Sequence, residues 1–400
     1  MKSLVEKVFK IGIWINEDDF PETGGGFSYT ERLINSINQR EFDRRIEILF
    51  VGFNLKGKFN KKTVSLPFKE SYWERKRVNF YHRFFSISLE RKDIVKNYNE
   101  AKAILKHHDI QLIFYTNPFI ALDNYPYICI NWDLGHKSTF SFPELTMNGE
   151  FLKRDAYFNK VLNEALIICC ESTRGKQELV QYSRINPERI KILPMFPGKI
   201  VDHDVISEEP EWISSTDSFF IYPAQFWAHK NHYHLLNGLR LFREKPPYAA
   251  HKLVLTGSDK GNMAYIKNLV NTYGLKDVVV IPGFVKEEEL KWLYKNAVGL
   301  VFPSFLGPTN MPLLEALNIG CPIACSNLPG HIELLGDSAV YFDPQKDKEI
   351  AEAMISLTNV NLKTEKTATS NLNNELQILE DIFIESIAIR RTWGQFDKIK

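Results

Sequence analysis

The sequence predicts an α/β protein with two doubly wound units, each built on a parallel sheet. Short apolar runs alternate with amphipathic stretches along the whole chain, as expected for parallel strands joined by helical crossovers. The chain has 400 residues, which is too long for one ordinary core, since domains typically span roughly 100–200 residues. We therefore expect two domains.

The first domain is predicted at residues 1–200. Its amphipathic stretches predict helices, and Ser172 provides an N-cap for the last of them. The predicted strands are residues 8–15, 46–51, 112–115, 128–132, 166–170 and 190–193, and the predicted helices are residues 29–39, 94–107, 150–164 and 172–182. Acidic and polar residues 201–218 interrupt the pattern and predict a linker.

The second domain is predicted at residues 219–375, where the alternation restarts. A last helix, at about residues 375–393, has a broad apolar face that requires a buried partner surface. The predicted strands are residues 219–224, 252–256, 278–282, 298–302, 323–326 and 340–342.

The composition is that of a soluble globular enzyme. A charged share of 25% and a net charge of +1 give no sign of a nucleic-acid partner. No apolar run approaches the roughly 18 residues of a membrane span, and residues 1–10 lack the apolar core of a signal peptide. We expect a cytoplasmic protein. The cysteines lie in or beside apolar runs and are expected to be reduced core residues: Cys129, Cys169, Cys170, Cys321 and Cys325.

Residues 302–322 predict a strand, a tight loop and a helix. Pro303 ends the apolar strand, and Asn310 and Met311 stand where the helix begins. Free N–H groups and the positive end of the helix dipole would face the loop, which favours an anion site. Glu315 lies about one turn inside the helix, close to its mouth.

Two further segments can contact a phosphate. The glycines Gly24, Gly25 and Gly26 follow the first strand and can bring backbone amides close to an anion, or can simply allow a turn with positive φ angles. Lys230 lies where a helix begins after the strand at residues 219–224, and it suits a phosphate contact. Alternatively, Lys230 and the neighbouring histidines lie on the solvent-exposed face of a helix and bind no ligand.

Asp133 and His136 follow a buried strand of the first domain. At the carboxyl end of a parallel sheet, an acid–base or hydroxyl contact would reach into the cleft between the domains. The alternative is an aspartate that caps its own loop and a surface histidine.

Landmarks in the second domain occur in the order found in the family-four retaining glycosyltransferases of the GT-B fold, of the glycosyl transferases group 1 type. They are Gln225 with Lys230, then Gly257, then Gly283-Phe284-Val285, then Pro303-Ser304 leading to Glu315. The chain resembles this family strongly over residues 219–344 and weakly in the first half. The resemblance implies two Rossmann-like domains facing across a cleft, with residues 376–400 crossing back to the first domain.

The resemblance also implies roles for individual residues. Glu315 would bind the ribose hydroxyls of a nucleoside-diphosphate sugar, Lys230 the diphosphate, and the backbone at Phe284 and Val285 the base. The implied donor site comprises Gly25, Gly26, Gln225, Lys230, Gly257, Phe284, Val285, Thr309, Asn310, Met311 and Glu315, and the implied catalytic residues are Asp133, His136 and Lys230. Cations and helix N-termini can stabilise the departing diphosphate, so no metal or other cofactor is expected.

Three positions depart from the family pattern. Gly307 stands where the family has the first of two glutamates separated by seven residues. Gln225 replaces an arginine at a strand end, and Trp132 replaces the histidine that often precedes the aspartate at the position of Asp133. Thr309 and Asn310 are then the polar candidates for contacting the sugar.

Residues 56–92 combine eleven Lys or Arg with three Glu and several aromatic residues. This mixture suits an anionic membrane surface on the inner face of the plasma membrane. It is equally compatible with a solvated loop and helix whose aromatic residues are buried.

We expect a retaining, metal-independent enzyme that extends a surface polysaccharide or lipid-linked glycan. By the resemblance alone, mannose from GDP-mannose is the expected donor sugar. A nucleotide-sugar-binding pseudoenzyme and a nucleotide-sugar epimerase of the same fold remain as alternatives.

Overall fold

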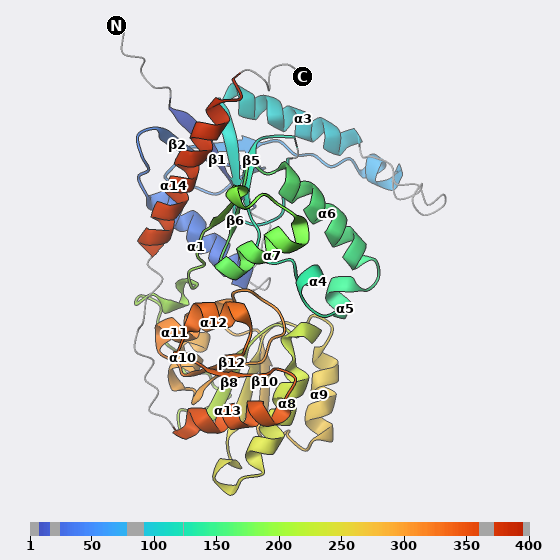
Figure 1. Cartoon of the computed structure of the whole chain (residues 1–400), viewed down its shortest axis with the longest axis vertical. Helices are drawn as coiled ribbons and strands as arrows, with labels where there is room; N and C mark the ends of the chain where they lie inside the picture. The colour runs from blue at the N-terminus through green and yellow to red at the C-terminus, as the bar shows by residue number, and fades with distance from the viewer. Residues whose placement is uncertain (1–7, 17–24, 78–91, 123, 360–371, 395–400) are drawn as a thin grey trace.

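The computed structural model describes residues 8–16, 25–77, 92–122, 124–359 and 372–394. Two parallel sheets, each flanked by helices, lie one above the other along the long axis of the molecule (Figure 1). This arrangement is the predicted two-domain α/β fold. Within the described ranges, no helix is both long enough and apolar enough to cross a bilayer.

The N-terminal sheet has the order β3-β2-β1-β4-β5-β6-β7, with parallel neighbours throughout. Its strands are β1 Phe9–Trp14, β2 Ile46–Phe53, β3 Thr63–Leu66, β4 Ile110–Tyr115, β5 Tyr127–Ile130, β6 Ile167–Cys170 and β7 Ile190–Ile192. Its helices are α1 Gly25–Gln39, α3 Lys92–His107, α4 Gly135–Ser138, α5 Pro143–Thr146, α6 Glu150–Glu164 and α7 Thr173–Ser183.

Several local features differ from the sequence expectation, and the short helices α4 and α5 are among them. The edge strand β3 was not predicted, because its four residues alternate between exposed and buried within a strongly basic segment. Helix α1 begins at Gly25 instead of Tyr29, so Gly25 and Gly26 form its first turn and are not loop residues. The predicted N-cap of α7 is present, since the Ser172 hydroxyl accepts the Gly175 N–H at 3.0 Å.

The C-terminal sheet has the order β10-β9-β8-β11-β12-β13 and is also parallel. Its strands are β8 Phe219–Pro223, β9 Lys252–Thr256, β10 Val279–Gly283, β11 Gly299–Phe302, β12 Ile323–Ser326 and β13 Val340–Phe342. Its helices are α8 His232–Arg243, α9 Met263–Thr272, α10 Glu287–Asn296, α11 Met311–Ile319, α12 Pro329–Leu335 and α13 Asp347–Asn359. Short 3-10 turns, η3 Lys199–Val201 and η4 Ala228–Lys230, flank the cleft.

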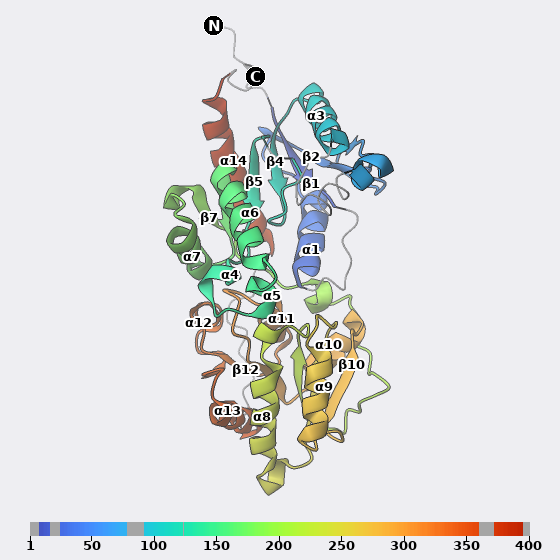
Figure 2. The same ribbon diagram turned by 90° about the vertical axis from the view of Figure 1, so that its right-hand side faces the viewer.

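The last helix, α14 (Leu372–Arg391), packs on the N-terminal sheet, far from α13 (Figures 1 and 2). Phe383 is fully buried there, and its ring centroid lies 5.4 Å from that of Phe114. Glu380 pairs with Arg40 at 2.7 Å. The expected crossing of the C-terminal helix back to the first domain is therefore confirmed.

Replacement of Phe383 by Ala should destabilise the N-terminal domain strongly. Removing a fully buried aromatic ring typically costs about 3–5 kcal/mol of unfolding free energy. Ile389→Ala, on the same helix but 38% exposed, is the matched control and should cost less than about 1 kcal/mol. Denaturant unfolding measures the free energy of unfolding of both variants. Equal losses would mean that packing of the buried face of α14 does not hold this helix on the N-terminal domain.

Candidate functional site

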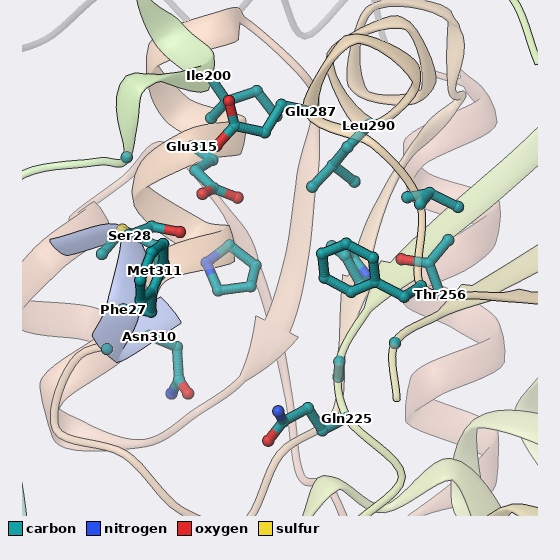
Figure 3. Close-up of a pocket in the computed structure, with 18 of the residues that line it drawn as sticks. Phe27, Ser28, Ile200, Gln225, Thr256, Glu287, Leu290, Asn310, Met311 and Glu315 are labelled. Atoms are coloured by element: carbon teal, nitrogen blue, oxygen red, sulfur yellow. The ribbon is translucent and has the colours of Figure 1, made fainter. Parts of the chain in front are cut away.

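A cavity of about 540 Å³ lies between the two domains (Figure 3). It is enclosed by the first turn of α1, by the carboxyl ends of the C-terminal strands, and by α10 and α11. Every predicted donor-side residue except Gly25 lines it: Gly26, Gln225, Lys230, Gly257, Phe284, Val285, Thr309, Asn310, Met311 and Glu315. Gly25 is the residue before Gly26, at the start of α1.

Close backbone approaches bring these segments together. A Cβ atom at Gly26 would lie 2.8 Å from the Trp132 ring, which also lines the cavity, so the first turn of α1 can rest against that ring only without a side chain. Gly257 has a φ of +137°, and a Cβ there would collide with the Ala224 carbonyl. Glycine at these two positions therefore allows neighbouring segments of the cavity wall to pack closely against one another.

Lys230 is held firmly at the edge of the cavity. Its carbonyl accepts the Tyr222 hydroxyl at 2.6 Å, and its Nζ donates to Asn310 Oδ1 at 3.0 Å. The ammonium also lies 5.4 Å from the centroid of the Phe302 ring. Burial lowers the pKa of Lys230 to about 8, although the negative charge of Asp133 opposes that change.

A chain of hydrogen bonds orients the Asn310 amide toward Lys230. His331 Nδ1 donates to the Ser326 carbonyl at 2.9 Å, which leaves His331 Nε2 as an acceptor. Asn310 Nδ2 donates to that nitrogen at 2.9 Å and to the Leu306 carbonyl at 3.2 Å. Burial lowers the pKa of His331 to about 4, so this arrangement persists at neutral pH. The Asn310 oxygen is therefore fixed on the side of the lysine.

Gly307 occupies the position of the missing family glutamate. Its φ is +125°, and a Cβ there would overlap the Asn310 side chain. The loop between β11 and α11 is thus built around glycine, and the amide of Asn310 fills the space beside it.

Helix α11 begins at Met311, as predicted, and Asn310 is its N-cap residue. Pro312 carries no N–H, and the Leu313 N–H is used by the Asn310 carbonyl at 3.0 Å. Among the first three helical positions, at most the Met311 amide is left for a ligand. The mouth of α11 therefore offers fewer amides than the sequence suggested.

The carboxylate of Glu315 points from α11 into the cavity (Figure 3). Its Oε2 accepts the Tyr294 hydroxyl at 2.9 Å. Burial raises the pKa of Glu315 to about 7, and the Tyr294 hydrogen bond moderates that rise. Two vicinal hydroxyl groups are suitable partners for such a carboxylate.

Sequence reasoning missed a charged group on the cavity wall. Lys199, from the start of the interdomain connection, lies 3.4 Å from Glu287 of α10 and 3.8 Å from Glu31 of α1. Although burial opposes it, these two carboxylates raise the pKa of Lys199. No motif marks these three residues, because they come from distant segments. Among the described residues, no cluster of His, Cys, Asp and Glu side chains has a metal-binding arrangement.

The two predicted acceptor-side residues do not line the cavity. Asp133 Oδ1 accepts the Gly135 N–H at 2.7 Å, a bond within its own loop. The buried His136 ring packs against Phe151 and Phe158, with centroids 5.7 Å away in each case. Burial lowers the pKa of His136. The ring thus packs on α6 and does not line the cavity, which gives no support to a catalytic contact.

The predicted membrane-binding segment at residues 56–92 is described in part, since residues 78–91 lie outside the described ranges. Tyr72 and Trp73 are 61% and 75% exposed. Lys76 lies over both rings, 4.7 and 5.9 Å from their centroids. These two aromatic residues are therefore not core residues.

Gly307→Ala tests whether the conformation of the β11–α11 loop requires glycine at this position. We expect it to lower the free energy of unfolding by about 2–4 kcal/mol, through positive φ and overlap with Asn310. Gly261→Ala has a comparable φ of +101° with open space around it, so it should cost only about 1 kcal/mol. Denaturant titration compares the two, and equal costs would show that contact with Asn310 is unimportant.

The C-terminal half of the chain is similar to one family of known proteins. Residues 206–372 match the family model of glycosyl transferases group 1. The O-antigen chain mannosyltransferase RfbU of Salmonella typhimurium is 25% identical over 158 residues, which cover 40% of this chain and 42% of RfbU. The chain spans 16%, 42% and 26% of the lengths of the first curated relatives that it matches.

Solved structures match over nearly the whole chain. A glycosyltransferase from Rickettsia africae has a TM-score of 0.65 at 13% identity, with 95% of this chain and 99% of the other covered. Anabaena Alr3699/HepE, solved with UDP and glucose, has a TM-score of 0.59 at 15% identity, with 98% and 99% covered. Residues 206–372 are therefore similar to the glycosyl transferases group 1, and the chain as a whole has the GT-B fold.

Proposed function

We propose that this protein is a retaining glycosyltransferase that uses a nucleoside-diphosphate sugar and needs no metal ion. One observation carries the proposal, namely that the donor-side residues predicted from separate motifs converge on a single interdomain cavity. Relatives named as O-antigen chain mannosyltransferases and as a serotype-specific mannosyltransferase support a polysaccharide or lipid-linked glycan as acceptor and mannose as the transferred sugar. We propose GDP-mannose as the donor of that mannose.

In this proposal, Lys230 and the Met311 amide bind the diphosphate. Negative charge grows on the diphosphate as the bond to the sugar breaks, and a fixed ammonium stabilises that charge in a site shielded from water. The low pKa of Lys230 reflects its burial, and an anion placed beside the ammonium would raise that pKa. Binding of a diphosphate supplies that anion.

At the other end of the cavity, Glu315 would accept hydrogen bonds from the two ribose hydroxyls, and the segment at Phe284 and Val285 would contact the base. The acceptor hydroxyl would attack the sugar on the face that the diphosphate leaves, and its proton would pass to a phosphate oxygen. Such a step needs no strong protein base, which is compatible with Asp133 capping its own loop.

The exposed Tyr72, Trp73 and Lys76 support peripheral contact with an anionic membrane surface, where lipid-linked acceptors reside. We propose that the protein works on the cytoplasmic face of that membrane.

A panel of GDP-, UDP- and dTDP-sugars tests the function, with thermal stabilisation and release of nucleoside diphosphate measured in the presence of a membrane extract that contains acceptor glycans. We expect GDP-mannose to give both effects. Lys230→Ala and Glu315→Ala should each weaken donor binding by more than about 1 kcal/mol, whereas Lys267→Ala, on the exposed side of α9, should not. Stabilisation without release of nucleoside diphosphate would favour a pseudoenzyme. The absence of both stabilisation and release would refute the donor site.

Binding of a nucleoside diphosphate should also depend on pH through Lys230. Its pKa of about 8 means that the charge is present below pH 8 and is lost as the pH rises through that value. Affinity should therefore fall above about pH 8, and binding at about pH 9 should take up protons. Calorimetry in two buffers with different ionisation heats measures the uptake. Lys230→Met should abolish it, and equal heats in both buffers for the wild type would contradict the assignment.

A further inference from the structure

His229, the residue immediately before Lys230, is bound by a side chain from the opposite domain. Glu144, in α5 of the N-terminal domain, accepts two hydrogen bonds through the same oxygen, Oε1. The His229 backbone N–H donates at 3.0 Å and its Nδ1 lies at 2.6 Å. Both side chains are nearly buried, with exposed fractions of 9% for Glu144 and 11% for His229. This contact lies on the domain interface, beside the proposed diphosphate site.

The protonation state of the pair follows from its environment. Although burial opposes it, the hydrogen bonds from the His229 ring and backbone keep the pKa of Glu144 below its usual value. Burial lowers the pKa of His229. An ionised carboxylate can only accept hydrogen bonds, so the neutral imidazole must carry its proton on Nδ1.

The same residue is also held from its own domain. The His229 carbonyl accepts the Phe305 N–H at 2.9 Å, which ties it to the β11–α11 loop. The Phe305 carbonyl in turn accepts the Thr139 hydroxyl at 3.1 Å. The Phe142 ring packs on Phe305 with centroids 5.6 Å apart. The loop that begins near Asp133 therefore meets the donor-site loops at His229 and Phe305.

We propose that Glu144 is a positioning residue for Lys230. From the N-terminal domain, Glu144 fixes the backbone at His229, the residue before the lysine. The affinity for a diphosphate therefore depends on contact between the domains. The inference rests on the proposed function, because it assigns the diphosphate to Lys230. Glu144 itself does not line the cavity, so it acts through the position of the lysine.

A second interdomain carboxylate provides a matched control. Glu333 of α12 accepts the N–H groups of Thr173 and Arg174, at 2.7 and 2.9 Å, at the first turn of α7. None of these three residues lines the cavity. Loss of Glu333 removes a comparable contact between the domains, and its partners lie on α7 and not on the segment of His229 and Lys230.

A double-mutant cycle on the full-length protein tests the inference, with GDP and UDP as calorimetric probes. We expect Glu144→Ala to weaken binding of the preferred nucleotide about tenfold. Glu144→Gln should stay within about twofold of the wild type, because an amide oxygen still accepts both bonds. Glu333→Ala should leave affinity unchanged. In a Lys230→Met background, Glu144→Ala should have no further effect.

The outcomes separate this inference from the proposed function. Wild-type affinity in Glu144→Ala, or a full additional loss in the Lys230→Met background, would overturn the positioning role alone. An equal loss in Glu333→Ala would show that general loosening of the interface is responsible. Unchanged affinity in Lys230→Met would overturn the proposed diphosphate site and this inference with it. Melting temperatures of all variants verify that each is folded.

Discussion

The charge of Lys230 is the constraint around which the cleft is organised. Its ammonium is removed from water and placed beside an aromatic ring and a neutral amide, and it gains no carboxylate at hydrogen-bonding distance among the contacts described for it. Burying such a charge is costly, so its surroundings must be held rigidly. Tyr222 fixes the lysine backbone, and His331 fixes the amide that faces the ammonium. An entering anion would relieve a cost that the folded protein already carries.

Much of the fold was predictable because parallel sheets require continuous apolar runs. Strands β9, β12 and β13 and helix α6 occur with the bounds expected from their apolar patterns. Strand β3 was missed because an edge strand buries only alternate residues and needs little apolar content. The early start of α1 was missed because two glycines disfavour a helix by propensity alone, whereas in the structure Gly26 belongs to the helix and lies close to the Trp132 ring.

The candidate site was predictable where a motif combines a strand end with a helix start, as at Lys230 and Glu315. It was not predictable where the direction of a side chain, or a contact between distant segments, determines whether a residue belongs to the site. His136 lies three residues after Asp133, but its ring packs on Phe158 of α6 and does not line the cavity. Glu31, Lys199 and Glu287 meet only because the fold brings them together. The gap left by Gly307 also gains an explanation, because the Asn310 amide occupies the space that a glutamate side chain would need.

The position of α14 has a consequence for the order in which the protein acquires its structure during synthesis. The C-terminal sheet and its helices are continuous in sequence, so that domain can complete its core as soon as α13 leaves the ribosome. The N-terminal sheet still lacks Leu379, Phe383 and Ile387 at that moment. The N-terminal domain is therefore completed after the C-terminal domain, and its uncovered apolar face must be kept from aggregation until α14 has been made.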